Sequence, residues 1–102
     1  MYRYKDGNTL VNVSSSILKY FGVSPQHKTY EPLDKLLEKN KDKKIVLFLF
    51  DAMGKKTLTT YKDVAPFIYK HKFQTVSAVF SPTTAASTTS ICNALYPSET
   101  GI

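Results

Sequence analysis

Two residues with metal-binding or reactive side chains each follow an apolar run in this sequence. Asp51 comes directly after the run Ile45–Phe50, and Thr84 comes shortly after the run Val76–Phe80. A carboxylate is a hard oxygen ligand for a divalent cation, and a hydroxyl can attack phosphorus when a metal ion lowers its pKa and supplies charge. Delivered to one place, the two groups would form half of a metal-assisted phosphoryl-transfer site.

Both residues also have plain structural interpretations. Asp51 could cap the helix that follows it, and Thr84 could be the N-cap of its own helix. The start of that second helix also collects backbone N–H groups and the positive end of the helix dipole, which suits a phosphate. The small residues Ala85, Ala86 and Ser87 permit either close approach of a substrate or tight helix packing.

A strand, a helical crossover and a second strand are the elements expected to position these groups. Residues 45–50 form a short uninterrupted apolar run, which is typical of a parallel strand buried on both faces. Residues 55–71 are expected to form one or two helical pieces with Pro66 as a kink, a break or a new first turn, and residues 73–80 a second strand. A right-handed crossover would make the strands parallel, so that neighbouring carboxyl ends lie about 5 Å apart.

Helices are also expected before the first strand. Val13, Ile17 and Phe21 share one helical face, and Gly22 would end that helix. A second helix is expected to begin near Pro32, since proline is favoured in the first turn.

Two motifs occur in the second half of the chain. Residues 45–54 end in Asp51-Ala52-Met53-Gly54, and residues 80–102 contain Thr83-Thr84-Ala85-Ala86-Ser87, then Tyr96-Pro97 and Gly101-Ile102. Together they resemble the alkaline phosphatase superfamily, and within it the nucleotide pyrophosphatase/phosphodiesterase branch. The first motif resembles the superfamily's first strand, which ends in a metal-ligating Asp and a Gly-Met-Gly-like turn. The second resembles its nucleophile helix, which in this branch opens at a threonine.

The resemblance implies roles for two residues. Asp51 matches the metal-ligand Asp, and Thr84 matches the nucleophile, which also touches a metal ion. The register rests on the ten-residue offset from Thr84 to the helix-ending glycine position, which is Ala94 here. Thr83 is the nucleophile if the register slips by one residue. The cofactors implied are two divalent metal ions, a zinc pair judged from the family, and a catalytic zinc typically needs three protein ligands.

The chain departs from the family pattern in three places. Ala52 stands where glycine is common, Asn93-Ala94 replaces Thr-Gly, and Thr100 replaces the usual histidine. The first two bear on turn geometry and the third on a polar contact near the site. Because the family's remaining Asp and His ligands have no counterpart in this sequence, we expect the N-terminal piece of a longer enzyme, inactive on its own.

The expected fold class is therefore α/β, an alkaline phosphatase-like α/β/α sandwich with a parallel sheet. Residues 1–43 would form an N-terminal arm with helices, and residues 44–102 the first βαβ unit and the nucleophile helix. The implied function is a metal-dependent phosphoester hydrolase of phosphodiesterase or nucleotide pyrophosphatase type. It would act on a phosphate ester or nucleotide-like small molecule through a phospho- or nucleotidyl-threonine intermediate. Two alternatives stay open: a non-catalytic α/β module that binds anions or a partner, and another metal-dependent branch such as a phosphomutase.

Composition and charge argue against several other classes. The chain has 102 residues and a net charge of +6, enough for one small domain. Arg3 is the only arginine and no nucleic-acid-binding motif accompanies the lysines, so no specific nucleic-acid partner is expected. The longest apolar run, Ile45–Phe50, is far too short to cross a membrane, and Cys92 is the only cysteine, which fits a reducing compartment. We expect a cytoplasmic protein without a membrane partner.

Overall fold

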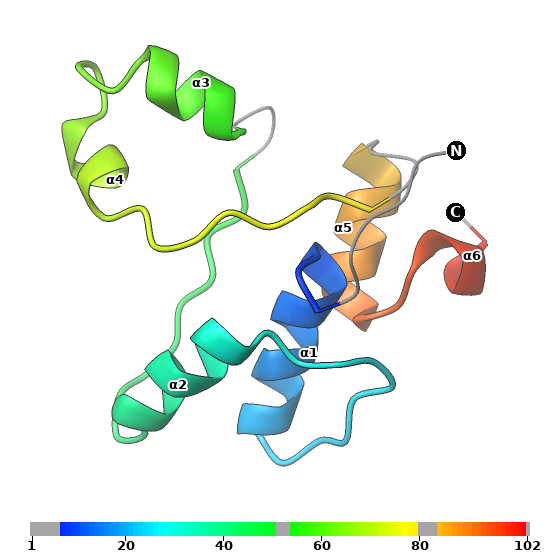
Figure 1. Cartoon of the computed structure of the whole chain (residues 1–102). Coiled ribbons are helices and arrows are strands. Elements are labelled where there is room, and N and C mark those ends of the chain that lie inside the picture. Colours follow the sequence, from blue (N-terminus) through cyan, green and yellow to red (C-terminus); the bar gives the residue numbers. More distant parts are fainter. Residues whose placement is uncertain (1–6, 51–53, 80–83, 102) are drawn as a thin grey trace. The chain divides into compact units, whose positions relative to one another are not determined.

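The computed structural model describes residues 7–50, 54–79 and 84–101. The chain divides into two compact units: the first joins residues 1–43 to residues 76–102, and the second comprises residues 44–75. Six helices lie in the described ranges (Figure 1). The first unit holds α1 (Leu10–Tyr20), α2 (Glu31–Lys39), α5 (Thr84–Asn93) and α6 (Pro97–Thr100), and the second holds α3 (Lys55–Thr60) and α4 (Pro66–Lys70).

The first unit is built around the pair α1 and α5. α1 contacts both α2 and α5, α5 contacts α6, and Figure 1 shows α1 beside α5. On α5 and just after it, the buried residues Ala86, Ser90 and Ala94 recur every four positions and share one face. Their small side chains let the backbone of α1 come close. The apolar centre is correspondingly small and consists of Val11, Val79, Ala86 and Tyr96.

Apart from Val11, the buried side of α1 is polar. Asn12 and the serines at positions 14–16 are buried, whereas Phe21, on the expected apolar face, is 65% exposed. The predicted helix is confirmed, but the face shared by Val13, Ile17 and Phe21 is not its buried face. A short hydroxyl fits inside a close helix contact and can bond the neighbouring backbone: the Ser14 hydroxyl donates to the Ile91 carbonyl at 2.7 Å. A large ring at that contact would hold the helices apart.

The start of α2 is fixed by α1. The Ser16 hydroxyl accepts a hydrogen bond from the Tyr30 N–H at 2.7 Å and lies 3.1 Å from the Tyr30 carbonyl oxygen, to which it can donate. Tyr30 immediately precedes α2, and Pro32 lies in the first turn, where its missing N–H costs no helical hydrogen bond. The predicted helix start near Pro32 is confirmed.

The first predicted strand is wrong. Residues 44–50 form an uncoiled segment that belongs to no strand (Figure 1), and Ile45–Phe50, expected to be buried, are 36% to 74% exposed. A strand is stable only when a neighbour takes up its backbone N–H and C=O groups. No backbone hydrogen bond joins this segment to another described residue. The apolar run shows what the segment could bury, but it does not supply a neighbour.

The second predicted strand, residues 73–80, is also absent from the described part of the chain. One isolated parallel bridge joins Ser77 to Thr9. There the Ser77 N–H donates to the Asn8 carbonyl at 2.9 Å, and the Leu10 N–H donates to the Ser77 carbonyl at 3.1 Å. This segment is therefore held by the residues just before α1, and it brings Val79 into the small core.

The predicted fold class is wrong for the same reason. The described residues contain helices and a single bridge but no strand or sheet. A parallel sheet needs at least two strands in register, and here one candidate segment has no neighbour while the other pairs at one residue only. The described residues therefore do not form an α/β/α sandwich with a parallel sheet.

The second unit holds two short helices, with Pro66 as the first residue of α4. Of the predicted alternatives for residues 55–71, the structure has two helical pieces, with Pro66 opening the first turn of the second. No described residue of this unit is buried. In neither unit does a helix of the described ranges have the length and apolar character needed to cross a membrane.

Candidate functional site

Thr84 is the first described residue of α5. Thr84 and Ala85 are exposed, while Ala86 faces the core. The predicted nucleophile therefore stands on the surface toward the N-terminal end of α5, the end where backbone N–H groups and the positive dipole end collect. Thr83, the alternative nucleophile, lies outside the described residues.

The other end of α5 has an unusual backbone. Ala94, which follows the last residue of the helix, has a φ of 54°. This left-handed conformation costs a residue with a Cβ about 1–2 kcal/mol and is ordinarily taken by glycine at helix ends. The Ala94 N–H donates to the Ser90 carbonyl at 2.8 Å, so the helix closes there. Ala94 is the position that the resemblance assigns to the helix-ending glycine.

A cluster of polar and aromatic side chains follows Ala94. The Glu99 carboxylate accepts a hydrogen bond from the Tyr96 N–H at 2.9 Å and lies 2.6 Å from His27 Nε2. The His27 ring packs edge-on against the Tyr96 ring, with centroids 4.7 Å apart. The hydrogen bond from the Tyr96 backbone, and next that from His27, lower the pKa of Glu99. The Tyr96 hydroxyl in turn lies 3.1 Å from Thr9 Oγ1.

This cluster joins two segments of the first unit. His27 lies in the loop between α1 and α2, and Glu99 lies in α6. The Glu99 cluster therefore holds the turn after α5 against the loop before α2, which is a structural role. The Tyr96-x-x-Glu99 spacing of a capping box could have revealed the Glu99 contact, whereas nothing in the sequence pointed to His27.

Asn12 is the second polar centre of the first unit. Its side-chain carbonyl accepts hydrogen bonds from the Gly7 N–H and the Thr9 N–H, each at 2.9 Å, and from the Thr9 hydroxyl at 2.7 Å. Its side-chain amide donates to the Lys28 carbonyl at 2.8 Å. One buried side chain thus ties the segment before α1 to the loop before α2. The Thr9-x-x-Asn12 spacing is that of a capping box.

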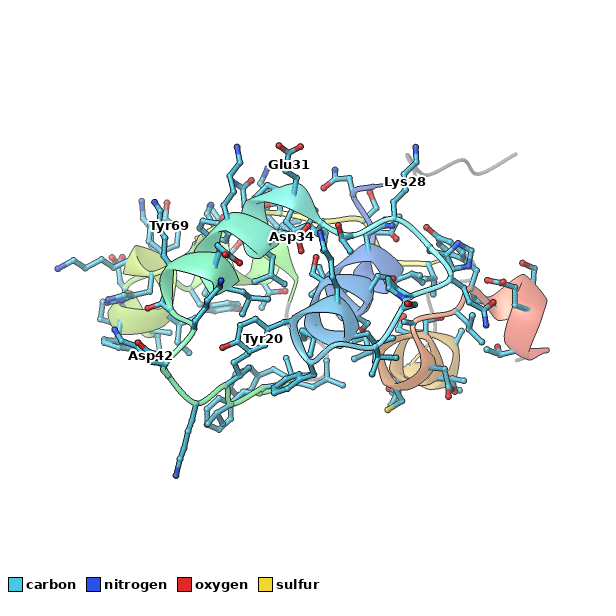
Figure 2. The ribbon with its side chains drawn as sticks, turned by 90° about the horizontal axis from the view of Figure 1, so that it is seen from below. Tyr20, Lys28, Glu31, Asp34, Asp42 and Tyr69 are labelled. Carbon is cyan, nitrogen blue, oxygen red and sulfur yellow. The ribbon has the colours of Figure 1, made fainter. Side chains whose placement is uncertain are left out.

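A cavity of about 490 Å³ lies between the second half of α1 and α2. Tyr20 and Asp34, labelled in Figure 2, come from its two sides. Its volume falls in the range of small-molecule sites, but its wall carries two positive and two negative side chains, so it favours neither charge. None of the predicted site residues belongs to it. The lining residues are Ser16, Lys19, Tyr20, Phe21, Asp34, Leu37, Glu38 and Lys41.

The predicted metal ligand Asp51 lies outside the described residues. Among the described ones, no three His, Cys, Asp or Glu side chains come together in a group that could hold a metal ion. A catalytic zinc typically takes three protein ligands. The described part of the chain therefore does not assemble a ligand set for the zinc pair that the resemblance implies.

Comparison with family models, with characterised proteins and with solved structures gives no match for this chain.

Proposed function

We propose that Thr84 is the nucleophile of a metal-dependent phosphoester hydrolase of phosphodiesterase or nucleotide pyrophosphatase type. The observation that carries the proposal is the backbone of Ala94. Ten residues after Thr84, it takes the left-handed conformation that suits the helix-ending glycine of the resembled family. This match supports the register that makes Thr84, rather than Thr83, the nucleophile.

The proposed reaction uses Thr84 in two steps. Its oxygen forms a bond to phosphorus while the bond to the leaving oxygen breaks, and the hydroxyl proton ends on that oxygen. Water then attacks the phospho- or nucleotidyl-threonine, and Thr84 regains its proton. The exposure of Thr84 gives a phosphate ester access, and the N-terminal end of α5 favours its negative charge. Two divalent ions, held in part by Asp51 and Thr84, would supply further charge stabilisation when bound.

The test uses the native gene product that contains residues 1–102, assayed with zinc on a chromogenic phosphodiester and a phosphomonoester. Thr84→Ala is expected to lower kcat/KM by at least about 10³-fold, as the loss of a covalent nucleophile does. The matched control is Thr88→Ala, an exposed threonine one turn further along α5, which should leave activity unchanged. Full activity in Thr84→Ala, or loss of activity in Thr83→Ala alone, would overturn the assignment.

The 102-residue chain by itself is expected to show no turnover. This part of the proposal is checked separately, by assaying that chain with zinc on the same two substrates. Turnover that Thr84→Ala abolishes would show that the chain needs no further ligands.

We also propose a cytoplasmic location, because the only cysteine, Cys92, has no second cysteine in the sequence with which to form a disulfide.

One observation favours a second candidate, a non-catalytic module that binds a partner. Among the large apolar residues of the second unit, Phe48, Val64 and Phe67 are each more than 70% exposed. Exposed apolar surface of this kind is typical of interaction sites. A native gene product that shows no Thr84-dependent hydrolysis in the assay above, but does associate through this unit, would favour the module over the enzyme.

A further inference from the structure

Two contacts between α1 and the α2 region frame the cavity described above. At one, the Ser16 hydroxyl bonds the Tyr30 backbone, and at the other the Tyr20 hydroxyl donates to the Lys41 carbonyl at 2.9 Å. Ser16 and Tyr20 lie one turn apart on α1, and both line the cavity of about 490 Å³. Because every lining residue belongs to the first unit, the cavity is a feature of that unit alone.

Two of the four charges on the cavity wall neutralise each other, since Lys41 Nζ lies 2.6 Å from the Glu38 carboxylate. The other two are Lys19 on α1 and Asp34 on α2. The Asp34 carboxylate accepts a hydrogen bond from the Thr29 hydroxyl, but neither Asp34 nor Lys19 forms an ion pair with any described residue. The two helices therefore present one positive and one negative group, each without a counter-charge in the described part of the chain.

The same wall carries an apolar surface. The Tyr20 and Phe21 rings pack edge-on, with centroids 5.0 Å apart and planes at 89°. Leu37 lies three residues after Asp34, on the same face of α2. Phe21 lines the cavity and is nevertheless 65% exposed. A ligand ring placed here would remove apolar surface from water and pack against the aromatic pair.

We propose that this cavity binds an amino acid with an aromatic side chain, held as a zwitterion between α1 and α2. Its carboxylate pairs with Lys19, its ammonium group pairs with Asp34, and its ring covers Phe21 and Leu37. Because Lys19 and Asp34 do not pair with each other, the ligand breaks no existing ion pair when it binds. A ligand with a single charge would leave one of the two wall charges unmatched, whereas a zwitterion matches both.

This site is independent of the proposed hydrolase activity, because Thr84 does not line the cavity. Binding is weak, since Lys19 is exposed, Asp34 is only half-buried and an amino acid makes few contacts. A Kd of about 1 mM is expected for L-phenylalanine.

The first experiment compares four ligands by NMR titrations that follow the backbone amide signals of the 102-residue chain. L-Phenylalanine should shift the signals of the lining residues in a saturable way. Phenethylamine lacks the carboxylate, 3-phenylpropionate lacks the ammonium group and glycine lacks the ring, so each should bind at least about ten-fold more weakly. Three outcomes would each overturn the proposal: no saturation with L-phenylalanine by about 10 mM, shifts confined to residues outside the cavity wall, or a single-charge analogue that binds as tightly.

The second experiment assigns each charge of the ligand to its partner. Lys19→Met should weaken L-phenylalanine binding about ten-fold but leave phenethylamine unchanged, because phenethylamine has no carboxylate. Asp34→Asn should weaken L-phenylalanine by about the same factor without weakening 3-phenylpropionate, which has no ammonium group. The asparagine side chain can still accept the hydrogen bond from the Thr29 hydroxyl, so the start of α2 should persist.

The matched controls are Lys35→Met and Glu31→Gln. These two residues form an exposed ion pair on α2 and do not line the cavity, so both variants should bind L-phenylalanine like the wild type. Circular dichroism checks that the helices persist in all four variants. Wild-type affinity in Lys19→Met or in Asp34→Asn, or an equal loss in the controls, would show that the two wall charges do not hold the ligand.

Discussion

The two units of this chain use their residues in opposite ways. The first unit buries polar side chains: Thr9, Asn12 and Ser16 are almost completely inaccessible, and each hydrogen-bonds to residues of the same unit. The second unit carries a run of six large apolar residues, and none of its described residues is buried. Burial in this chain therefore follows the availability of a partner surface rather than the hydrophobicity of a segment.

The comparison also separates two sources of stability. In the first unit the apolar centre is small, so buried hydrogen bonds carry much of its specificity, because an unsatisfied buried polar group is costly. In the second unit the short helices α3 and α4 gain little from burial, and short helices are marginal without packing. We expect the first unit to respond strongly to single substitutions and the second to respond little.

The largest effect is expected at Asn12. Asn12→Ala would leave the Thr9 N–H, the Thr9 hydroxyl and the Lys28 carbonyl without their present partner. We expect a loss of about 3 kcal/mol in the free energy of unfolding, because several buried groups lose hydrogen bonds at once. Urea denaturation followed by circular dichroism measures it.

The matched control for Asn12 is Asn93→Ala. Asn93 is exposed on α5 and makes one side-chain hydrogen bond, to the Thr89 carbonyl at 3.0 Å. Its loss should cost less than about 0.5 kcal/mol. Equal losses at the two positions would contradict the idea that buried polar contacts hold the first unit together.

The second effect compares one residue type in the two units. Val11 is completely buried and Val64 is 81% exposed. Val11→Ala should lower the free energy of unfolding by about 2 kcal/mol, through lost burial and a small cavity, whereas Val64→Ala should change it by less than about 0.5 kcal/mol. Paired thermal melts measure both. A similar loss at Val64 would mean that the second unit buries surface in solution.

The sequence predicted the helices better than it predicted what they bury. Gly22 and Pro32 marked where α1 ends and where α2 begins, because those residues act on the backbone locally. The apolar stripe Val13–Ile17–Phe21 did not mark the buried face. A pattern of hydrophobicity cannot show that small serines allow a closer contact with α5, since that depends on the partner helix. The strand predictions were wrong for the same reason: a strand depends on a neighbouring segment, and Ile45–Phe50 has no described neighbour.

At the candidate site, as in the fold, the sequence predicted local backbone features better than contacts between elements. A helix was predicted from Thr83 or Thr84, and α5 contains Thr84 as its first described residue. The left-handed Ala94 lies where the motif register expected glycine. The contact between His27 and Glu99 was missed because no local spacing joins the two residues. The Thr9–Asn12 and Tyr96–Glu99 contacts have the three-residue spacing of a capping box, which could have revealed them.

The third effect is a gain in stability at the interface of α1 and α5. The hydroxyls of Ser15 and Ser90 are completely buried, with no hydrogen-bond partner in the described part of the chain. Ser15→Ala and Ser90→Ala should each raise the free energy of unfolding by about 1 kcal/mol, since each removes an unsatisfied hydroxyl and adds a better helix former. Ser14→Ala is the control and should lose about 1 kcal/mol, because it breaks the bond to the Ile91 carbonyl. If all three variants were destabilised alike, packing rather than hydrogen bonding would govern this interface.

The smallest effect is a change in pH dependence at Glu99. Hydrogen bonds from the Tyr96 N–H and from His27 hold the pKa of Glu99 below its ordinary value in the folded chain. The folded state therefore binds a proton less readily than the unfolded state. The stabilisation from this carboxylate is fully present above the unfolded pKa and is lost as the pH falls through the lower, folded pKa.

Glu99→Gln should flatten the fall in Tm below about pH 5, because its amide does not titrate in that range. Tyr96→Phe keeps the backbone N–H that bonds Glu99 and removes only the hydroxyl near Thr9, so it should keep the wild-type slope in acid while lowering Tm at every pH. A Glu99→Gln variant with the same acid slope as the wild type would show that the contact between His27, Tyr96 and Glu99 adds nothing to the stability of the first unit.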